Sequence, residues 1–86
     1  MMTRYVMLPE HMQDSARLYV ERGIEPGGFL CAVLENNLTE AFGRADSINR
    51  DAMFEWACWL YNDAPGDCWG SPEKVAAWIK THKEAR

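Results

Sequence analysis

The sequence has no long apolar stretch. No run approaches the roughly 20 residues that a membrane-spanning helix requires, and the opening MMTRYVMLPE lacks the apolar core of a signal peptide. We therefore expect a protein that has no membrane partner and is found in the cytoplasm.

Cysteine and histidine are scarce and widely spaced. The three cysteines are Cys31, Cys58 and Cys68, and neither they nor the two histidines form the tight pairs that zinc sites use. We expect no metal and no cofactor. Cys31 and Cys58 fall within apolar helical patterns, which predicts small core residues, and Cys68 is the only cysteine in a predicted loop.

Basic residues are fewer than acidic ones, and sequence motifs for catalysis are missing. Nine Lys and Arg face 13 Asp and Glu, for a net charge of −4, so duplex DNA is not an expected partner. The chain has no Gly-x-Ser-x-Gly, no phosphate-binding loop and no His-Glu-x-x-His. We expect no catalytic residue and no enzymatic activity.

The chain does have strong helical periodicity. Residues 9–22 place four apolar side chains on one face: Met12, Ala16, Tyr19 and Val20. Pro9 suits the first helical position, and Gly23 suits the left-handed position after a helix end. Residues 1–8 show no such period and are predicted to form a short extended arm or an edge strand.

Residues 28–45 continue the helical pattern across an Asn36-Asn37 pair. This stretch could form one helix or two short ones. We favour a break, because two poor helix formers are followed by a capping signature in which Glu40 lies three residues after Asn37.

The helix predicted around residues 48–61 is apolar on most of its sides. One stripe holds Ile48, Ala52, Trp56, Trp59 and Leu60, and it is widened by Met53, Phe54, Ala57 and Tyr61. A small core cannot easily absorb so many large side chains. We therefore expect a homo-oligomer with an interface formed by Met53, Trp56, Trp59 and Tyr61.

The stretch PGDCWGSPEKVAAW, residues 65–78, has the chemistry of a helix start. Ser71 is suited to cap the last helix and Pro72 to occupy its first position. Trp69 could either plug the helix ends or face a partner, and we favour the plug. The complete chain, 1–86, is predicted to be one all-α domain, a compact bundle of four to five short helices with the arm 1–8 at its start.

Two predicted helix starts are flanked by glycine, and backbone N–H groups at such ends can hold phosphate. The alternative is that these glycines only permit tight turns. The candidate residues for a phosphate-bearing ligand each offer an accessible backbone, a positive charge or a stacking ring. They are Gly27, Gly28, Arg44, Arg50, Tyr61 and Trp69.

Four segments, RGIEPGGFLCAVLENNL, GRAD, WLYNDAP and CWGSPEKV, resemble small helical accessory proteins of tailed phages and prophages. The resemblance implies phage origin and action in the host cytoplasm; it implies no activity and assigns no residue a role. For such a protein we expect a binding role in anti-defence or host modulation. The most specific version of this hypothesis is that a homo-oligomer captures a nucleotide immune signal. The alternatives are direct inhibition of a host defence protein and a virion or assembly function.

Overall fold

The structure, a computed structural model, describes residues 4–85, and the regular secondary structure within them is all helical. The predicted all-α class is confirmed. The helices divide more finely than expected, because the stretch from residue 28 to residue 62 is interrupted three times, at residues 35–37, at residues 45–46 and at Ala52. The elements are α1 (Glu10–Arg22), α2 (Gly28–Leu34), α3 (Leu38–Arg44), α4 (Ser47–Asp51), α5 (Met53–Asn62), the 3-10 turn η1 (Gly66–Cys68) and α6 (Pro72–Ala85).

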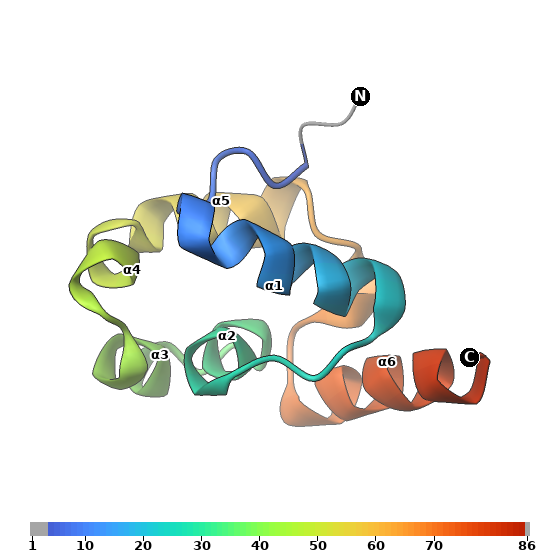
Figure 1. Ribbon diagram of the computed structural model, residues 1–86. Coiled ribbons are helices and arrows are strands. Elements are labelled where there is room, and N and C mark those ends of the chain that lie inside the picture. The colour runs from blue at the N-terminus through green and yellow to red at the C-terminus, as the bar shows by residue number, and fades with distance from the viewer. Residues whose placement is uncertain (1–3, 86) are drawn as a thin grey trace.

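The helices are arranged in two layers. Figure 1 shows α1, α4 and α5 above α2, α3 and α6, with α6 extending away from the rest at the C-terminal end. The radius of gyration, 12.0 Å, equals the value of about 12 Å expected for a compact chain of this length. The largest fully buried side chains come from both layers: Trp56, Trp59, Tyr19, Leu30, Leu34 and Cys68.

The first helix ends as its sequence predicts. Gly23 adopts the left-handed conformation with φ of 66°, and its N–H donates to the Tyr19 carbonyl oxygen at 2.9 Å. A side chain at Gly23 would meet the His82 ring of α6, because a Cβ at this position would lie 2.8 Å from the imidazole Cγ. Glycine is therefore required here for both its conformation and its size.

The described part of the N-terminal arm is not extended, and that prediction is wrong for residues 4–8. These residues form a turn in which the Leu8 N–H donates to the Tyr5 carbonyl oxygen at 3.1 Å. Leu8 is buried, and the Tyr5 ring lies 6.2 Å from the Trp59 ring, centroid to centroid. Burial of these two side chains favours the folded turn over an extended strand. Residues 1–3 of the predicted arm lie outside the described residues.

The break at Asn36-Asn37 is confirmed. Asn36 has a positive φ of 64°, and the Asn37 side-chain oxygen accepts a hydrogen bond from the Glu40 N–H at 3.2 Å. The reciprocal half of the capping box is not formed. The Asn37 N–H donates to the Ala32 carbonyl instead, and the Glu40 carboxylate bonds to Arg44.

A further break, which the apolar pattern did not predict, separates α4 from α5 at Ala52 (φ −100°, ψ 15°). Because of this break, the apolar residues of α4 and α5 do not lie on one continuous face, as the sequence predicts. Trp56 is buried, whereas Ile48, expected on the same face, is 58% exposed. Asn49 explains part of this geometry, because it is buried and its side-chain oxygen accepts from the Trp56 indole N–H at 3.2 Å.

The opening of the last helix follows prediction, since Ser71 Oγ accepts from the Lys74 N–H at 3.1 Å. The Gly70 N–H donates to the Leu34 carbonyl at 2.8 Å, which fastens this segment to the end of α2. Trp69 is half-buried and contacts the core, as the plug prediction states.

The burial of the three cysteines is the reverse of what the sequence predicts. Cys68 is fully buried, whereas Cys31 and Cys58 are half-buried. The 3-10 turn carries Cys68 inward, and the Tyr19 hydroxyl donates to the Cys68 carbonyl oxygen at 2.7 Å. Burial raises the pKa of the Cys68 thiol to about 11.

Candidate functional site

The structure brings two of the six predicted ligand residues together. The Arg44 side chain lies against Gly28, with a guanidinium nitrogen 2.8 Å from a Cβ placed on that glycine. Its Nε also donates to a Glu40 carboxylate oxygen at 2.6 Å. The hollow around them is lined by Gly28, Cys31, Ala32, Glu35, Glu40 and Arg44. A phosphate placed there would face two carboxylates beside a guanidinium that is already paired.

Trp69, Arg50 and Tyr61 lie elsewhere, whereas Gly27 directly precedes Gly28 but does not line the hollow. Trp69 precedes Gly70, which binds the Leu34 end of α2. Because α2 has seven residues, that end is about 10 Å from Gly28 at 1.5 Å per residue. Arg50 belongs to α4 and Tyr61 to α5, and neither lines the hollow. Gly27 has open space beside it. The predicted set therefore does not converge on one ligand surface.

The predicted interface is only partly at the surface. Trp56 and Trp59 are 1% and 0% exposed, so their assignment to an interface is wrong. Their rings pack edge-on against each other, and Trp56 does the same with Phe29. The core thus absorbs the tryptophans that were expected to be in excess. Met53 is half-buried and Tyr61 is 85% exposed.

An apolar groove lies between α5 and the corner that joins α2 to α3. We call it the α3–α5 groove. It encloses about 130 Å³, and no charged side chain lines it within the described residues. From α5 it receives Met53, Ala57 and Leu60, which share a face at helical spacing. From α2, α3 and their junction it receives Ala32, Val33, Asn36, Asn37, Leu38 and Ala41, and Trp56 contributes from α5.

Exposed aromatic side chains continue this surface outward along α5. Phe54 and Tyr61 are 75% and 85% exposed. They lie seven residues apart with exposed Ala57 between them, so one stripe of the helix joins the lip of the groove to both rings. Across the groove, Leu38 is 66% exposed.

Sequence reasoning assigned Met53 and Tyr61 to an exposed surface, but it did not single out Phe54 or Leu38. The spacing of α5 alone contains no signal that could have separated its buried face from its exposed one, since apolar residues occupy nearly all of its sides. The orientation of the helix in the bundle makes that distinction.

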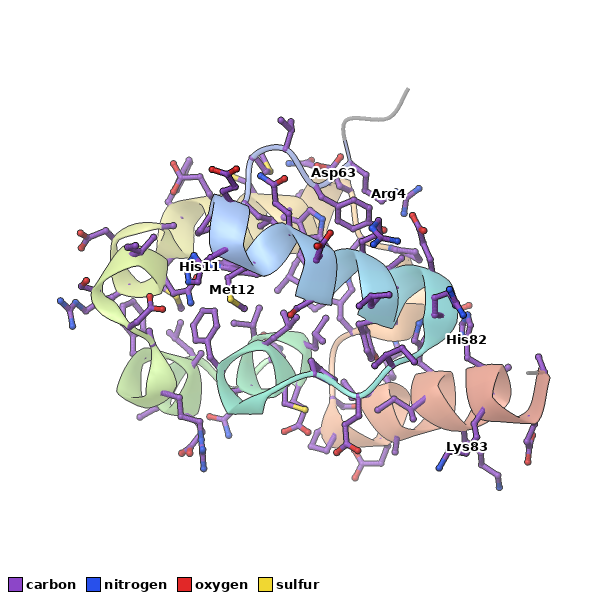
Figure 2. The ribbon with its side chains drawn as sticks, in the orientation of Figure 1. Arg4, His11, Met12, Asp63, His82 and Lys83 are labelled. Carbon is purple, nitrogen blue, oxygen red and sulfur yellow. The ribbon has the colours of Figure 1, made fainter. Side chains whose placement is uncertain are left out.

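Ionisable side chains away from the groove have structural roles. His11 Nε2 lies 3.0 Å from an Asp46 carboxylate oxygen and links α1 to α4. Figure 2 shows His82 between α6 and the end of α1, and Lys83 on the outer side of α6. The Asn49 N–H bonded to Asp46 holds the pKa of that carboxyl below its usual value, and His11 acts in the same direction.

The described residues hold neither a metal-binding cluster nor a membrane span. Across residues 4–85, no three His, Cys, Asp or Glu side chains are grouped so that they could hold a metal ion. In the same part of the chain, no helix is long and apolar enough to span a membrane.

Comparison with known proteins adds no relative. No protein-family model, curated protein or solved structure matches this chain. Function is therefore inferred from the α3–α5 groove and the residues around it.

Proposed function

We propose that the protein acts by binding another protein, one of whose helical segments docks in the α3–α5 groove. The observation that carries the proposal is the continuity of the groove with the exposed rings of Phe54 and Tyr61. Apolar side chains scattered singly over a surface need no explanation, but a concave patch edged by large aromatic rings is typical of a recognition surface.

The dimensions are compatible with a docked helix. A hollow of about 130 Å³ is close in size to the cavity of about 150 Å³ that accepts benzene in an engineered protein core. It can therefore take one large apolar side chain as an anchor. Phe54 and Tyr61 are separated by about 10 Å along α5, which matches the i to i+7 distance between anchors on a docked helix.

The resemblance to phage accessory proteins supports a host protein as the target, which would make the binding inhibitory in an anti-defence or host-modulating role. Capture of a nucleotide signal has less support, because Gly28 and Arg44 share their hollow with Glu35 and Glu40. Native mass spectrometry with a panel of nucleotides tests that alternative. A stoichiometric adduct would favour it over the groove.

The proposal is tested by selecting binders from a display library of random helical peptides. We expect peptides that bind the unmodified protein and lose binding to an Ala57→Arg variant, in which a long charged side chain covers the lip of the groove. Ala77→Arg is the matched control, since Ala77 is also an exposed alanine within a helix, but on α6.

Both variants must unfold at the temperature of the unmodified protein, because both positions are exposed. The proposal would be overturned if the peptides bind the Ala57→Arg variant as well as the unmodified protein, or if Ala77→Arg weakens their binding equally. Either result would place recognition on another surface. A library that yields no binder sensitive to Ala57→Arg would overturn it as well.

A further inference from the structure

We infer that two copies of this chain pair through one exposed face of α5, with Phe54 of each copy against Tyr61 of the other. We call this surface the Phe54–Tyr61 face, and it consists of Phe54, Ala57, Cys58 and Tyr61. Because Ala57 also lines the α3–α5 groove, the pairing covers the lip of the groove and regulates access to it. This regulatory step rests on the proposed function, whereas the pairing itself does not.

The four residues share one side of the helix. At about 100° per residue, Phe54 and Tyr61 lie within about 20° of each other around the axis of α5, and Ala57 and Cys58 lie about 50° to either side of them. Both rings are exposed, Ala57 is exposed and Cys58 is half-buried. The face therefore consists of two large rings about 10 Å apart along the helix, with two small residues between them.

This arrangement is complementary to itself under a two-fold rotation. The midpoint between Phe54 and Tyr61 falls between Ala57 and Cys58. A two-fold axis beside that point, perpendicular to α5 and between the two helices, makes the helices antiparallel and places each Phe54 opposite Tyr61 of the other copy. Small residues at the centre let the helices approach to about 8 Å, and an aromatic pair forms at each end. The chain thus supplies both halves of the contact.

Charge does not oppose this contact. Glu55 is the one charged residue of α5, and it lies about 100° around the helix from Phe54 and about 120° from Tyr61. The carboxylates of both copies therefore lie outside the contact, and no like charges meet within it. An uncharged face of this kind matches a second uncharged helix, and the same helix of another copy has the matching spacing of rings.

The area of the face indicates a weak dimer. Phe54 and Tyr61 are 75% and 85% exposed, and each buried aromatic side chain contributes roughly 150–250 Å². Covering both rings therefore removes roughly 300 Å² of surface from each copy and roughly 600 Å² from the pair. The rings alone supply about half of the roughly 1,200 Å² at which stable interfaces begin. We therefore expect a dimer that forms at high protein concentration and dissociates on dilution.

Ala57 connects this dimer to the α3–α5 groove. It lies at the centre of the two-fold contact and also lines the groove. A partner helix in the groove and α5 of a second copy need the same alanine, so the two exclude each other. Dimerisation thus covers the groove at high concentration, and a partner helix that binds the groove dissociates the dimer.

Sedimentation velocity tests the dimer. Between about 5 and 500 μM protein, we expect the mass to rise from that of one chain towards that of two, because mass action favours the dimer at high concentration. Phe54→Ser and Tyr61→Ser should each raise the dissociation constant at least about tenfold. Ile48→Ser is the matched control, since it removes an exposed apolar side chain from α4, and it should leave the dissociation constant unchanged. At the lowest concentration, where the chain is monomeric, all three variants should unfold at the temperature of the unmodified protein.

Disulfide formation at Cys58 tests the position of the two-fold axis. For helices about 8 Å apart, the two Cys58 Cα atoms would lie about 5 Å apart, within the range that a disulfide bridges. Oxidised glutathione should therefore link two chains: two thiols form one disulfide, and the oxidant is reduced to two molecules of glutathione. On non-reducing gels the linked dimer should persist in Cys31→Ser and be absent in Cys58→Ser.

The outcomes separate this inference from the proposed function. A chain that stays monomeric at the highest concentration, or a dimer that persists in Phe54→Ser and Tyr61→Ser, would overturn the pairing without affecting peptides that depend on Ala57. A dimer that never links through Cys58 would overturn the two-fold contact. Failure to obtain any groove-dependent peptide overturns the proposed function and leaves the dimer. Where both are found, the peptide should dissociate the dimer, and a complex of two chains with two peptides would overturn the regulatory step.

Discussion

The two buried tryptophans of α5 provide a matched test of the core. Trp56 and Trp59 are both almost completely buried and contact each other at 5.8 Å between ring centroids. They differ at the indole nitrogen. The Trp56 N–H donates to the buried Asn49 side-chain oxygen at 3.2 Å, whereas the Trp59 N–H has no acceptor among residues 4–85.

Replacing each tryptophan with phenylalanine should therefore have unequal effects on the free energy of unfolding. Both variants lose a similar amount of buried ring, so that loss largely cancels in the comparison. Trp56→Phe also leaves the Asn49 oxygen buried without its donor, which costs about 1–3 kcal/mol. Trp59→Phe instead removes a buried, unpaired donor, whose desolvation costs a similar amount. We expect Trp56→Phe to be the less stable variant by at least about 2 kcal/mol.

Urea unfolding followed by far-ultraviolet circular dichroism measures this difference without relying on tryptophan fluorescence. The two variants should share one slope of free energy against urea and differ in midpoint. In thermal unfolding, the expected difference is about 10 °C for a domain of this size.

An additional variant locates the cause. In an Asn49→Ala background, Trp56→Phe should cost no more than Trp59→Phe does alone, because the hydrogen bond is already absent. If Trp59→Phe is as destabilising as Trp56→Phe in the unmodified background, the reasoning from the unpaired indole N–H is refuted.

Three further predictions concern the helix ends and the cysteine in the 3-10 turn. Gly23→Ala should destabilise by about 1–2 kcal/mol from its left-handed conformation alone, and by more from the contact with the His82 ring; thermal unfolding measures this, and an unchanged midpoint would contradict it. Ser71→Ala should cost about 0.5–2 kcal/mol, whereas Ser71→Asp should retain the cap and most of the stability. Cys68 should react with iodoacetamide only on unfolding, because burial keeps it protonated and inaccessible, and rapid labelling in the native state, located by peptide mapping, would show that the turn opens.

A fourth prediction concerns acid. The pKa of Asp46 is lower in the folded protein than its usual value, so the carboxylate stabilises the fold above that usual value. The contribution is lost as the pH falls through the lowered pKa. Asp46→Asn keeps a capping side chain but cannot titrate. The stability difference between the unmodified protein and this variant should shrink on acidification to about pH 3, and a constant difference would contradict the assignment.

Local chemistry made several helix boundaries predictable. Gly23, the Asn36-Asn37 pair and Ser71 each act through atoms within a few residues of themselves, and the structure confirms all three. The division at Ala52 was not predictable in this way. It accompanies a contact between Asn49 and Trp56 that only the folded core stabilises, because both groups must be removed from water together.

The candidate site was predictable only in part. Met53 and Tyr61 were identified from the apolar pattern; Met53 lines the α3–α5 groove, and Tyr61 is exposed on the adjoining stripe of α5. Trp56 and Trp59 were assigned to the same surface because they share the apolar helix, but they face the core. The pairing of Gly28 with Arg44 joins residues on different helices, which spacing along the chain does not reveal.

The sequence by itself determined that this is a small all-α domain, where its first helix ends, where its last helix begins, and that its second helical stretch divides at an asparagine pair. These properties depend on backbone conformation and on hydrogen bonds between near neighbours. Only the tertiary structure decided which side of α5 is buried and which forms a groove. An apolar helix presents similar side chains in every direction, and the partners against which it packs come from distant parts of the chain.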